Sequence, residues 1–131
     1  MSFDFTKGWS ADREGNSQIY TLDYETFNDL LLSSDPGVSI SKKIYDVAVK
    51  RTFNQATDSN PTWSPDGSFL AFTSNRDGDQ EIYIKELGTL EPYNLTNMPD
   101  SDEYQADWSP FGNTIIFTST ASGDPDIHAI D

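Results

Sequence analysis

The sequence predicts an all-β fold made of β-propeller blades, and an internal repeat carries the prediction. The segment Trp63–Gly67 (Trp-Ser-Pro-Asp-Gly) recurs 45 residues later as Trp108–Gly112 (Trp-Ser-Pro-Phe-Gly). The same step relates further identical residues without a gap: Phe72 and Phe117, Ser74 and Ser119, Gly78 and Gly123, Ile82 and Ile127. A repeat of this length, built of short strands and turns, is typical of a propeller blade.

One complete blade of four antiparallel strands is expected within residues 54–98. Alternating and β-branched segments bounded by turn residues predict its strands: Pro61–Ser64, Phe69–Ser74, Glu81–Lys85 and Tyr93–Leu95. The turn after the first strand contains Pro65, Asp66 and Gly67, in which proline presets φ and glycine permits positive φ. Its counterparts Pro110 and Gly112 predict the same turn in the next unit.

An incomplete blade is expected on each side of the complete one. Residues 99–131 repeat three strands, including Ile115–Phe117 and Asp126–Ile130, and then stop. In residues 1–53, the segment Ala11–Tyr20 matches Ser74–Tyr83 at an offset of 63 residues, but no Trp-Ser-Pro-Asp-Gly segment precedes it. The first blade therefore lacks its inner strand and the last blade lacks its outer one.

The offset of 63 instead of 45 places an insertion within residues 24–51. Phe27, Leu30 and Leu31 stand at i, i+3 and i+4, which predicts a short amphipathic helix that ends before Pro36-Gly37. The segment Ile44–Val49 is expected to form the outer strand of the first blade. The insertion also holds four of the eight basic residues of the chain: Lys42, Lys43, Lys50 and Arg51.

The chain is strongly acidic, with a net charge of −14, and the acidity is uneven. Residues 52–131 hold 14 acidic side chains against only Arg76 and Lys85. Such a surface argues against nucleic acid and anionic membranes as partners, because both require clustered Lys and Arg. There is no cysteine, no apolar run long enough to insert in a membrane, and no secretory signal pattern at Met1–Phe5.

Many of the acidic residues are expected on one face of the disc, where the loops between strands two and three meet the loops between blades. These residues are Asp12, Glu14, Asp58, Asp77, Asp79, Asp100, Asp102, Glu103 and Asp124. Only Arg13 and Arg76 oppose them there. The face could recognise a basic protein partner, and the alternative is a merely solvated surface.

Chemistry at a single site has little support in the sequence. Asn75, Asp77 and Asp79 beside Gly78 offer oxygen atoms suited to Ca²⁺, but turn formation explains the same residues and the spacing is not that of an EF-hand. No other cofactor is expected. The single histidine, His128, occupies the position of Tyr20 and Tyr83, and no nucleophile or phosphate motif occurs, so no catalytic residue is predicted.

The blade motifs resemble those of the TolB-like propeller family. The matching segments are Pro61–Gly67, Ser74–Gly78, Ile82-Tyr83 and Leu95-Thr96, with departures at Phe111 and His128 in the last unit. The resemblance implies a propeller that mediates protein–protein contacts, in a periplasmic or extracellular setting. It also implies an alternative, the non-catalytic propeller of a prolyl-oligopeptidase-like or tricorn-like peptidase.

A ring of the usual size needs more blades than the two and a half predicted here. Either the chain is part of a longer propeller, or several copies complete a ring. We expect Leu70, Phe72, Ile115 and Phe117 to form apolar side faces of the end blades, and Trp63 and Trp108 to be blade-core residues. The leading hypothesis is a non-enzymatic binding or scaffold module that forms a homo-oligomer; a purely structural assembly subunit is a further alternative.

Overall fold

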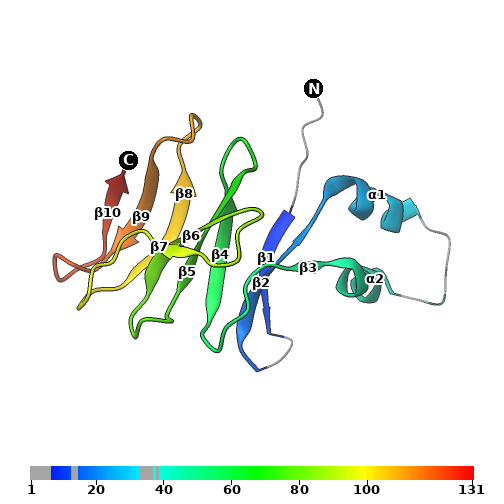
Figure 1. The fold of residues 1–131 in the computed structure, drawn as a ribbon, viewed down its shortest axis with the longest axis horizontal. Coiled ribbons are helices and arrows are strands. Elements are labelled where there is room, and N and C mark those ends of the chain that lie inside the picture. The colour runs from blue at the N-terminus through cyan, green and yellow to red at the C-terminus, as the bar shows by residue number, and fades with distance from the viewer. Residues whose placement is uncertain (1–6, 13–14, 33–36, 38) are drawn as a thin grey trace.

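Three antiparallel sheets stand side by side in the computed structural model, which describes residues 7–12, 15–32, 37 and 39–131 (Figure 1). The first sheet contains β1 (Lys7–Asp12), β2 (Ser17–Leu22) and β3 (Val49–Lys50) in that order. The second contains β4 (Asp58–Trp63), β5 (Phe69–Ser74), β6 (Glu81–Glu86) and β7 (Tyr93–Asn94). The third contains β8 (Glu103–Trp108), β9 (Ile115–Ser119) and β10 (Asp126–Ile130). The predicted all-β architecture of consecutive propeller blades is confirmed.

The repeat extends to backbone detail. The register between β4 and β5 shifts between Ser59 and Thr62, and the register between β8 and β9 shifts between Tyr104 and Asp107. Asn60 and Gln105, which lie inside these bulges, adopt left-handed φ values of 48° and 56°. Such a bulge bends and twists the strand. The same bend at the same repeat position gives both blades the same shape.

The insertion is mostly helical in its described part, which corrects one expectation. Helix α1 (Tyr24–Leu32) confirms the predicted amphipathic helix. Most of the segment Ile44–Val49, expected as the outer strand, instead lies in helix α2 (Ile40–Val47), and only Val49 belongs to the short outer strand β3. Ser39 caps α2 by accepting a hydrogen bond from the Lys42 backbone N–H at 3.3 Å. Lys42 pairs with Asp46 one turn later at 2.8 Å. These local helix signals outweighed the β-branched residues on which the strand was predicted.

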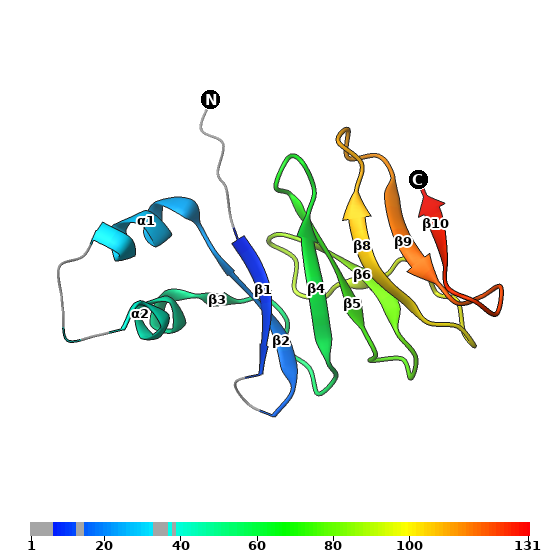
Figure 2. The same ribbon diagram turned by 180° about the vertical axis from the view of Figure 1, so that it is seen from behind.

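The two helices lie beyond the first sheet, on the side away from the second (Figure 1, Figure 2). No helix within the described ranges is long and apolar enough to cross a membrane. The helices therefore extend the row of sheets at its N-terminal end, opposite the third sheet.

The apolar core consists of two clusters, one at each contact between sheets. Leu70, Phe72 and Tyr83 of the second sheet pack with Ile19 of the first, and Trp63 packs against them. The alternate residues of the same strands face the other way, because successive side chains of a strand point to opposite faces.

The second cluster joins the second and third sheets. It consists of Ala71, Ile82, Ile84, Ala106, Ile115 and Phe117, with Trp108 packed at its border. The expectation that Leu70, Phe72, Ile115 and Phe117 form exposed end faces is therefore wrong, since all four are at most 5% exposed. Each faces the preceding or adjoining sheet, and the free face of the last blade carries the alternate residues.

An aromatic pair crosses each sheet at the same repeat position. The ring centroids lie 6.5 Å apart in Trp9–Tyr20, 6.1 Å in Phe72–Tyr83 and 5.9 Å in Phe117–His128. His128 thus packs as the tyrosines do, in the position that the sequence repeat assigned to it.

Candidate functional site

The tight turns that carry the repeat motif are fixed by side-chain hydrogen bonds. Asp66 Oδ1 accepts from Ser64 Oγ at 2.7 Å and from the Ser68 N–H at 3.0 Å, and these bonds lower the pKa of Asp66. Ser64 Oγ in turn accepts from the Phe69 N–H at 2.9 Å. Gly67 and Gly112 both adopt φ of 75°, which favours glycine.

The third blade keeps this turn although Phe111 replaces the aspartate. Ser109 donates to Asn113 Oδ1 at 3.1 Å and accepts from the Thr114 N–H at 3.2 Å. Asn113 therefore takes over part of the role of Asp66, and Phe111 is left 91% exposed at the tip of the turn. The motif residues of both turns are structural.

A second repeated contact ties each third strand to the loop that enters the next blade. Thr52 Oγ1 accepts from the Ile19 N–H at 2.9 Å, and Thr96 Oγ1 accepts from the Ile82 N–H at 3.0 Å. The side chain that precedes each of these isoleucines caps the same loop: Gln18 Oε1 accepts from the Asn54 N–H at 3.2 Å, and Glu81 Oε1 accepts from the Met98 N–H at 2.8 Å. The amide and the carboxyl group are geometric equivalents.

Two of the predicted loop-face carboxylates are instead buried at the start of inner strands. Asp58 and Glu103, 45 residues apart, are both fully buried. Asp58 accepts from Arg76 Nη2 at 3.2 and 3.3 Å and from Asn54 Nδ2 at 2.7 Å. A buried carboxylate needs such partners, because its desolvation is costly. The exposed acidic face is therefore smaller than the sequence suggested.

Glu103 has no such cation, because Ala121 occupies the repeat position of Arg76. Its Oε1 accepts from Ser101 and Ser119 hydroxyls, each at 2.7 Å, while Oε2 is buried without a hydrogen-bond partner in the described structure. Burial is the main cause that raises the pKa of Glu81, and the neighbouring Glu103 raises it further, against hydrogen bonds from Thr96 and Met98 that lower it. The junction between the second and third blades thus holds a buried pair of acids, and neither has an ion-pair partner among the described residues.

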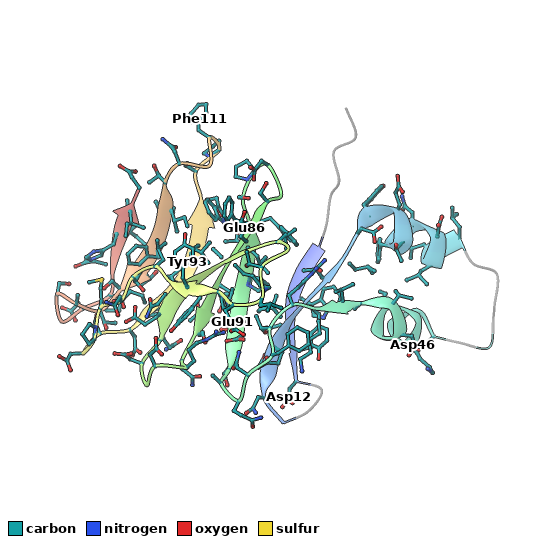
Figure 3. The ribbon with its side chains drawn as sticks, viewed as in Figure 1. Asp12, Asp46, Glu86, Glu91, Tyr93 and Phe111 are labelled. Atoms are coloured by element: carbon teal, nitrogen blue, oxygen red, sulfur yellow. The ribbon has the colours of Figure 1, made fainter. Side chains whose placement is uncertain are left out.

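The remaining acidic loop residues lie near the surface, and some of their carboxylates accept hydrogen bonds from backbone N–H groups of a neighbouring loop. Asp79 accepts from the Asp100 N–H at 3.1 Å, and Asp102 accepts from the Gln80 N–H at 3.0 Å. Asp12, which Figure 3 shows at the turn after β1, is exposed, as is Asp124. Glu14 and Arg13 lie outside the described residues. A binding role for these residues stays a prediction.

The candidate cation ligands do not share one partner. Asn75 Oδ1 accepts from the Thr57 N–H at 2.9 Å, while Asp77 accepts from the Tyr83 hydroxyl and from Asn94 Nδ2 at 3.1 Å. These two bonds, the first being the larger cause, lower the pKa of Asp77. Among the described residues, no group of three or more His, Cys, Asp or Glu side chains could hold a metal ion.

The first blade has an open inner edge, and a buried donor marks it. Trp108 Nε1 donates to the carbonyl oxygen of Thr62 in the preceding blade at 3.3 Å, and Thr62 pairs with Ala71. The repeat counterpart of Ala71 is Gly8, over which Trp63 Nε1 lies so closely that an added Cβ would approach it to 3.3 Å. In the described part of the chain, Trp63 Nε1 is buried without a hydrogen-bond partner, and no strand pairs with β1 on this inner edge, which faces away from β2.

The free face of the third blade is apolar. Ile116, Ile127 and Ala129 are exposed, Ile116 by 47% and Ile127 by 72%. Ile116 pairs directly with Ala129 across the β9–β10 ladder, and Ile127 lies two positions before Ala129 on the same strand, so the three side chains share one face. Their repeat counterparts are Ala71, Ile82 and Ile84, all at most 1% exposed. The sequence could have revealed this face, because the 45-residue step relates the two sets.

Comparison with known proteins agrees with this architecture. The sequence profile of the TolB beta propeller domain (PD40) matches residues 35–131. The chain belongs to this family. It is 33% identical over 82 residues to a protein named TolB homolog from Chlorobium luteolum, which covers 63% of this chain and 16% of that protein. It is also 40% identical over 53 residues to an uncharacterised peptidase, YuxL, from Bacillus subtilis, covering 40% of this chain and 8% of the peptidase.

Solved structures show the same fold. A structure described as TolB from Agrobacterium tumefaciens superposes with a TM-score of 0.74 at 18% identity, over 96% of this chain and 41% of the other. The crystal structure of TolB from Acinetobacter baumannii gives 0.71 at 23% identity, over 96% and 27%. The chain therefore spans less than half of each of these relatives.

Proposed function

We propose that this TolB-like propeller chain is a non-enzymatic protein-binding or scaffold module whose copies associate to complete a ring of blades. The observation that carries the proposal is the exposed face of Ile116, Ile127 and Ala129. The same repeat positions in the second blade are buried against the third. Exposure of this apolar surface to water is unfavourable, and packing against another blade would bury it.

The first blade, at the other end of the row of sheets, supports a contact that joins unlike ends of two copies. Among the residues that the structure describes, no strand pairs with β1 on the side away from β2, and Trp63 Nε1 has no acceptor. A backbone carbonyl from an inner strand would satisfy this donor, as Thr62 does for Trp108. The two ends differ in shape and chemistry, so the contact between copies is heterologous, from the last blade of one copy to the first blade of the next. A heterologous contact closes a ring when the rotation between successive copies adds up to a full turn.

A non-enzymatic role is supported by the structural use of the repeat residues. His128 packs on Phe117, and the motif serine and aspartate of the turn at Ser64–Ser68 bond to each other and to the backbone. The acidic loop face would contribute contacts with a basic protein partner, and family membership favours a periplasmic or extracellular setting.

The match to the peptidase from Bacillus subtilis favours one alternative, a propeller that accompanies a catalytic domain of a longer protein. In that case the last-blade face would be covered by a further blade of the same chain. A purely structural assembly subunit is the remaining alternative, in which ring formation is the whole function.

Light scattering of the purified chain at micromolar concentration tests the proposal. We expect a discrete oligomer of about two to three chains, because propellers close with roughly four to eight blades. A monodisperse monomer over the same concentrations contradicts self-association, and polydisperse aggregates favour the alternative in which the chain is part of a longer propeller.

A further inference from the structure

A cavity of about 450 Å³ lies between the first and second sheets. One wall consists of residues 50–54, which follow β3 into the second blade, and the other consists of the connection 87–92 between β6 and β7. In Figure 3, Glu91 marks this second wall. Arg76 and Lys85 of the second blade also line the cavity. Of the residues expected on the acidic loop face, only Arg76 lines it, and the residues of the free last-blade face do not.

Positive charge is concentrated around this cavity. Four of the eight basic residues of the chain line it: Lys50, Arg51, Arg76 and Lys85. Arg76 and Lys85 are the only basic residues among positions 52–131. One carboxylate, Glu91, lines the cavity with them, and the carboxylate of Asp58 pairs with Arg76. The cavity therefore keeps a positive excess in a chain whose net charge is −14.

The cationic groups are held in place by neutral partners. Lys85 is 6% exposed, and its Nζ donates to the carbonyl oxygens of Thr89 at 2.8 Å and Leu90 at 3.0 Å. Arg51 Nε donates to Thr21 Oγ1 at 2.7 Å. Neither Lys85 nor Arg51 has a carboxylate within ion-pair distance in the described structure. Because these side chains are already fixed, less conformational entropy would be lost when a ligand binds to them.

The surroundings of Lys85 disfavour its positive charge and would favour a nearby anion. Burial is the largest cause that lowers its pKa, Glu91 raises it, and the positive charges of Arg51 and Arg76 lower it further. Arg76 is itself fixed, since its guanidinium lies 4.4 Å from the centre of the Tyr83 ring and its Nε donates to Ser74 Oγ at 2.9 Å. An anion near these three cations would relieve their mutual repulsion.

We propose that this cavity binds a small organic oxyanion, a carboxylate or a phosphate, with its charged oxygens directed at Arg51, Arg76 and Lys85. Guanidinium groups offer paired N–H donors that match the geometry of carboxylate and phosphate. Phe53, Leu87 and Leu90 line the cavity as well and provide apolar contact for the body of the ligand. The volume lies within the range of roughly 300–1,000 Å³ that is typical of small-molecule sites. Because the site lies between two sheets of one chain, it does not depend on self-association.

Calorimetric titration with inorganic phosphate and, separately, with succinate tests this proposal. We expect saturable binding of one anion per chain for at least one of the two, and the tighter of them identifies the favoured oxyanion. Arg51→Gln should weaken binding by about tenfold or more, because a hydrogen bond between charged groups is lost. Lys42→Gln is the matched control: Lys42 is an exposed cation on α2, paired with Asp46 outside the cavity, and its removal should leave the affinity unchanged.

Backbone amide chemical shifts provide a second measurement that does not depend on a variant. Titration of the wild-type chain with the anion that binds more tightly should shift the amide signals of residues 50–54 and 87–92 at lower anion concentrations than those of the acidic loops. The proposal is overturned if neither anion binds saturably at millimolar concentration, if the two variants lose affinity equally, or if the shifts fall elsewhere.

Discussion

The second and third blades present the same repeat positions to different surroundings. Ala71, Ile82 and Ile84 form a buried face against the third blade, whereas Ile116, Ile127 and Ala129 form the same face of the third blade in water. The side-chain pattern is therefore set by the repeat, while burial depends on whether a neighbour exists. Apolar residues at exposed repeat positions agree with the proposal that another blade covers this face.

The two motif tryptophans show the complementary difference at the other end. Trp108 donates to a carbonyl oxygen on the inner strand of the preceding blade, whereas Trp63 Nε1 has no acceptor among the described residues, where no strand pairs with β1 on the side away from β2. Buried polar groups are nearly always paired in folded proteins. An unpaired donor at one end and an uncovered apolar face at the other together define what a neighbouring blade would supply.

The largest effect is expected from removing a motif tryptophan. Trp63→Ala should lower the free energy of unfolding by roughly 3–5 kcal/mol, since the ring packs against the cluster at the first junction. Trp108→Ala should cost less if the third blade is completed only on assembly. Denaturant unfolding measures both. Unchanged midpoints would mean that the rings do not serve as core anchors.

A milder pair separates the hydrogen bond from the packing. Trp108→Phe should cost about 1 kcal/mol more than Trp63→Phe, because only Trp108 donates its Nε1–H to a carbonyl. The same unfolding experiment measures the difference. Equal costs would show that the indole N–H of Trp63 also has a partner in solution.

The apolar faces are compared by truncating one isoleucine in each. Ile82→Ala should cost about 2–5 kcal/mol, because Ile82 is fully buried at the second junction. Ile127→Ala should stay within about 0.5 kcal/mol in a dilute monomeric sample, because a side chain exposed by 72% loses few contacts. A cost for Ile127→Ala that grows with protein concentration would point to a covered face, and equal large costs in dilute samples would contradict the exposure seen here.

The pair of buried acids predicts a pH dependence at the second junction. The native pKa of Glu81 lies above its ordinary value of 4.5, so the native state holds that proton more tightly than the unfolded chain does. The resulting stabilisation is fully present below pH 4.5 and is lost as the pH rises through the native pKa. Glu81→Gln, which copies Gln18 of the first blade, removes this loss.

The stability of Glu81→Gln relative to the wild type should therefore increase as the pH is raised from about 4 to about 7, as measured by denaturant unfolding. Glu86→Gln, at the exposed end of the same strand, is the control and should show no such trend. A parallel pH dependence of Glu81→Gln and wild type would show that Glu81 does not hold an extra proton in the folded state.

A small effect on folding, shared among four residues, is expected from the acidic loops. Changing Asp77, Asp79, Asp100 and Asp102 together to asparagine should cost about 1 kcal/mol or less, because surface carboxylates contribute little and asparagine retains an acceptor oxygen. Association with a polylysine probe, followed by stopped flow, should slow by on the order of tenfold at low ionic strength and less at high salt. Unchanged association would shift attention to the basic insertion at Lys42, Lys43, Lys50 and Arg51.

Most of the fold could be predicted from the sequence, because each blade repeat combines residues typical of tight turns with strands in which apolar and polar residues alternate. The strand Asp126–Ile130 and the turn at Pro65–Gly67 were both located from these local signals. Within the segment Ile44–Val49 that was expected as a strand, residues 44–47 are helical, since β-branched residues also suit a helix face once Ser39 caps it, and only Val49 lies in the outer strand β3. No repeat counterpart was available there to decide between the two.

The candidate sites were less predictable, because they depend on contacts between blades. Asp58 and Glu103 stand in polar segments of the sequence, yet inter-strand packing buries both. The cavity between the first two sheets joins Lys50 and Arg51 to Lys85, which are more than thirty positions apart in the chain. Only the packing of the first sheet on the second brings these residues together.

The central claim is that the free face of the last blade is covered by a second copy, and the molar mass of one charged variant tests it most directly. Ile127→Asp places a carboxylate on that face, at its most exposed isoleucine, whereas Phe111→Asp adds the same charge at the exposed turn and restores the repeat residue of Asp66. In light scattering at equal micromolar concentration, we expect an oligomer for the wild type and for Phe111→Asp, and a monomer for Ile127→Asp. A monomeric wild type, or an oligomer that Ile127→Asp leaves intact, would contradict the account.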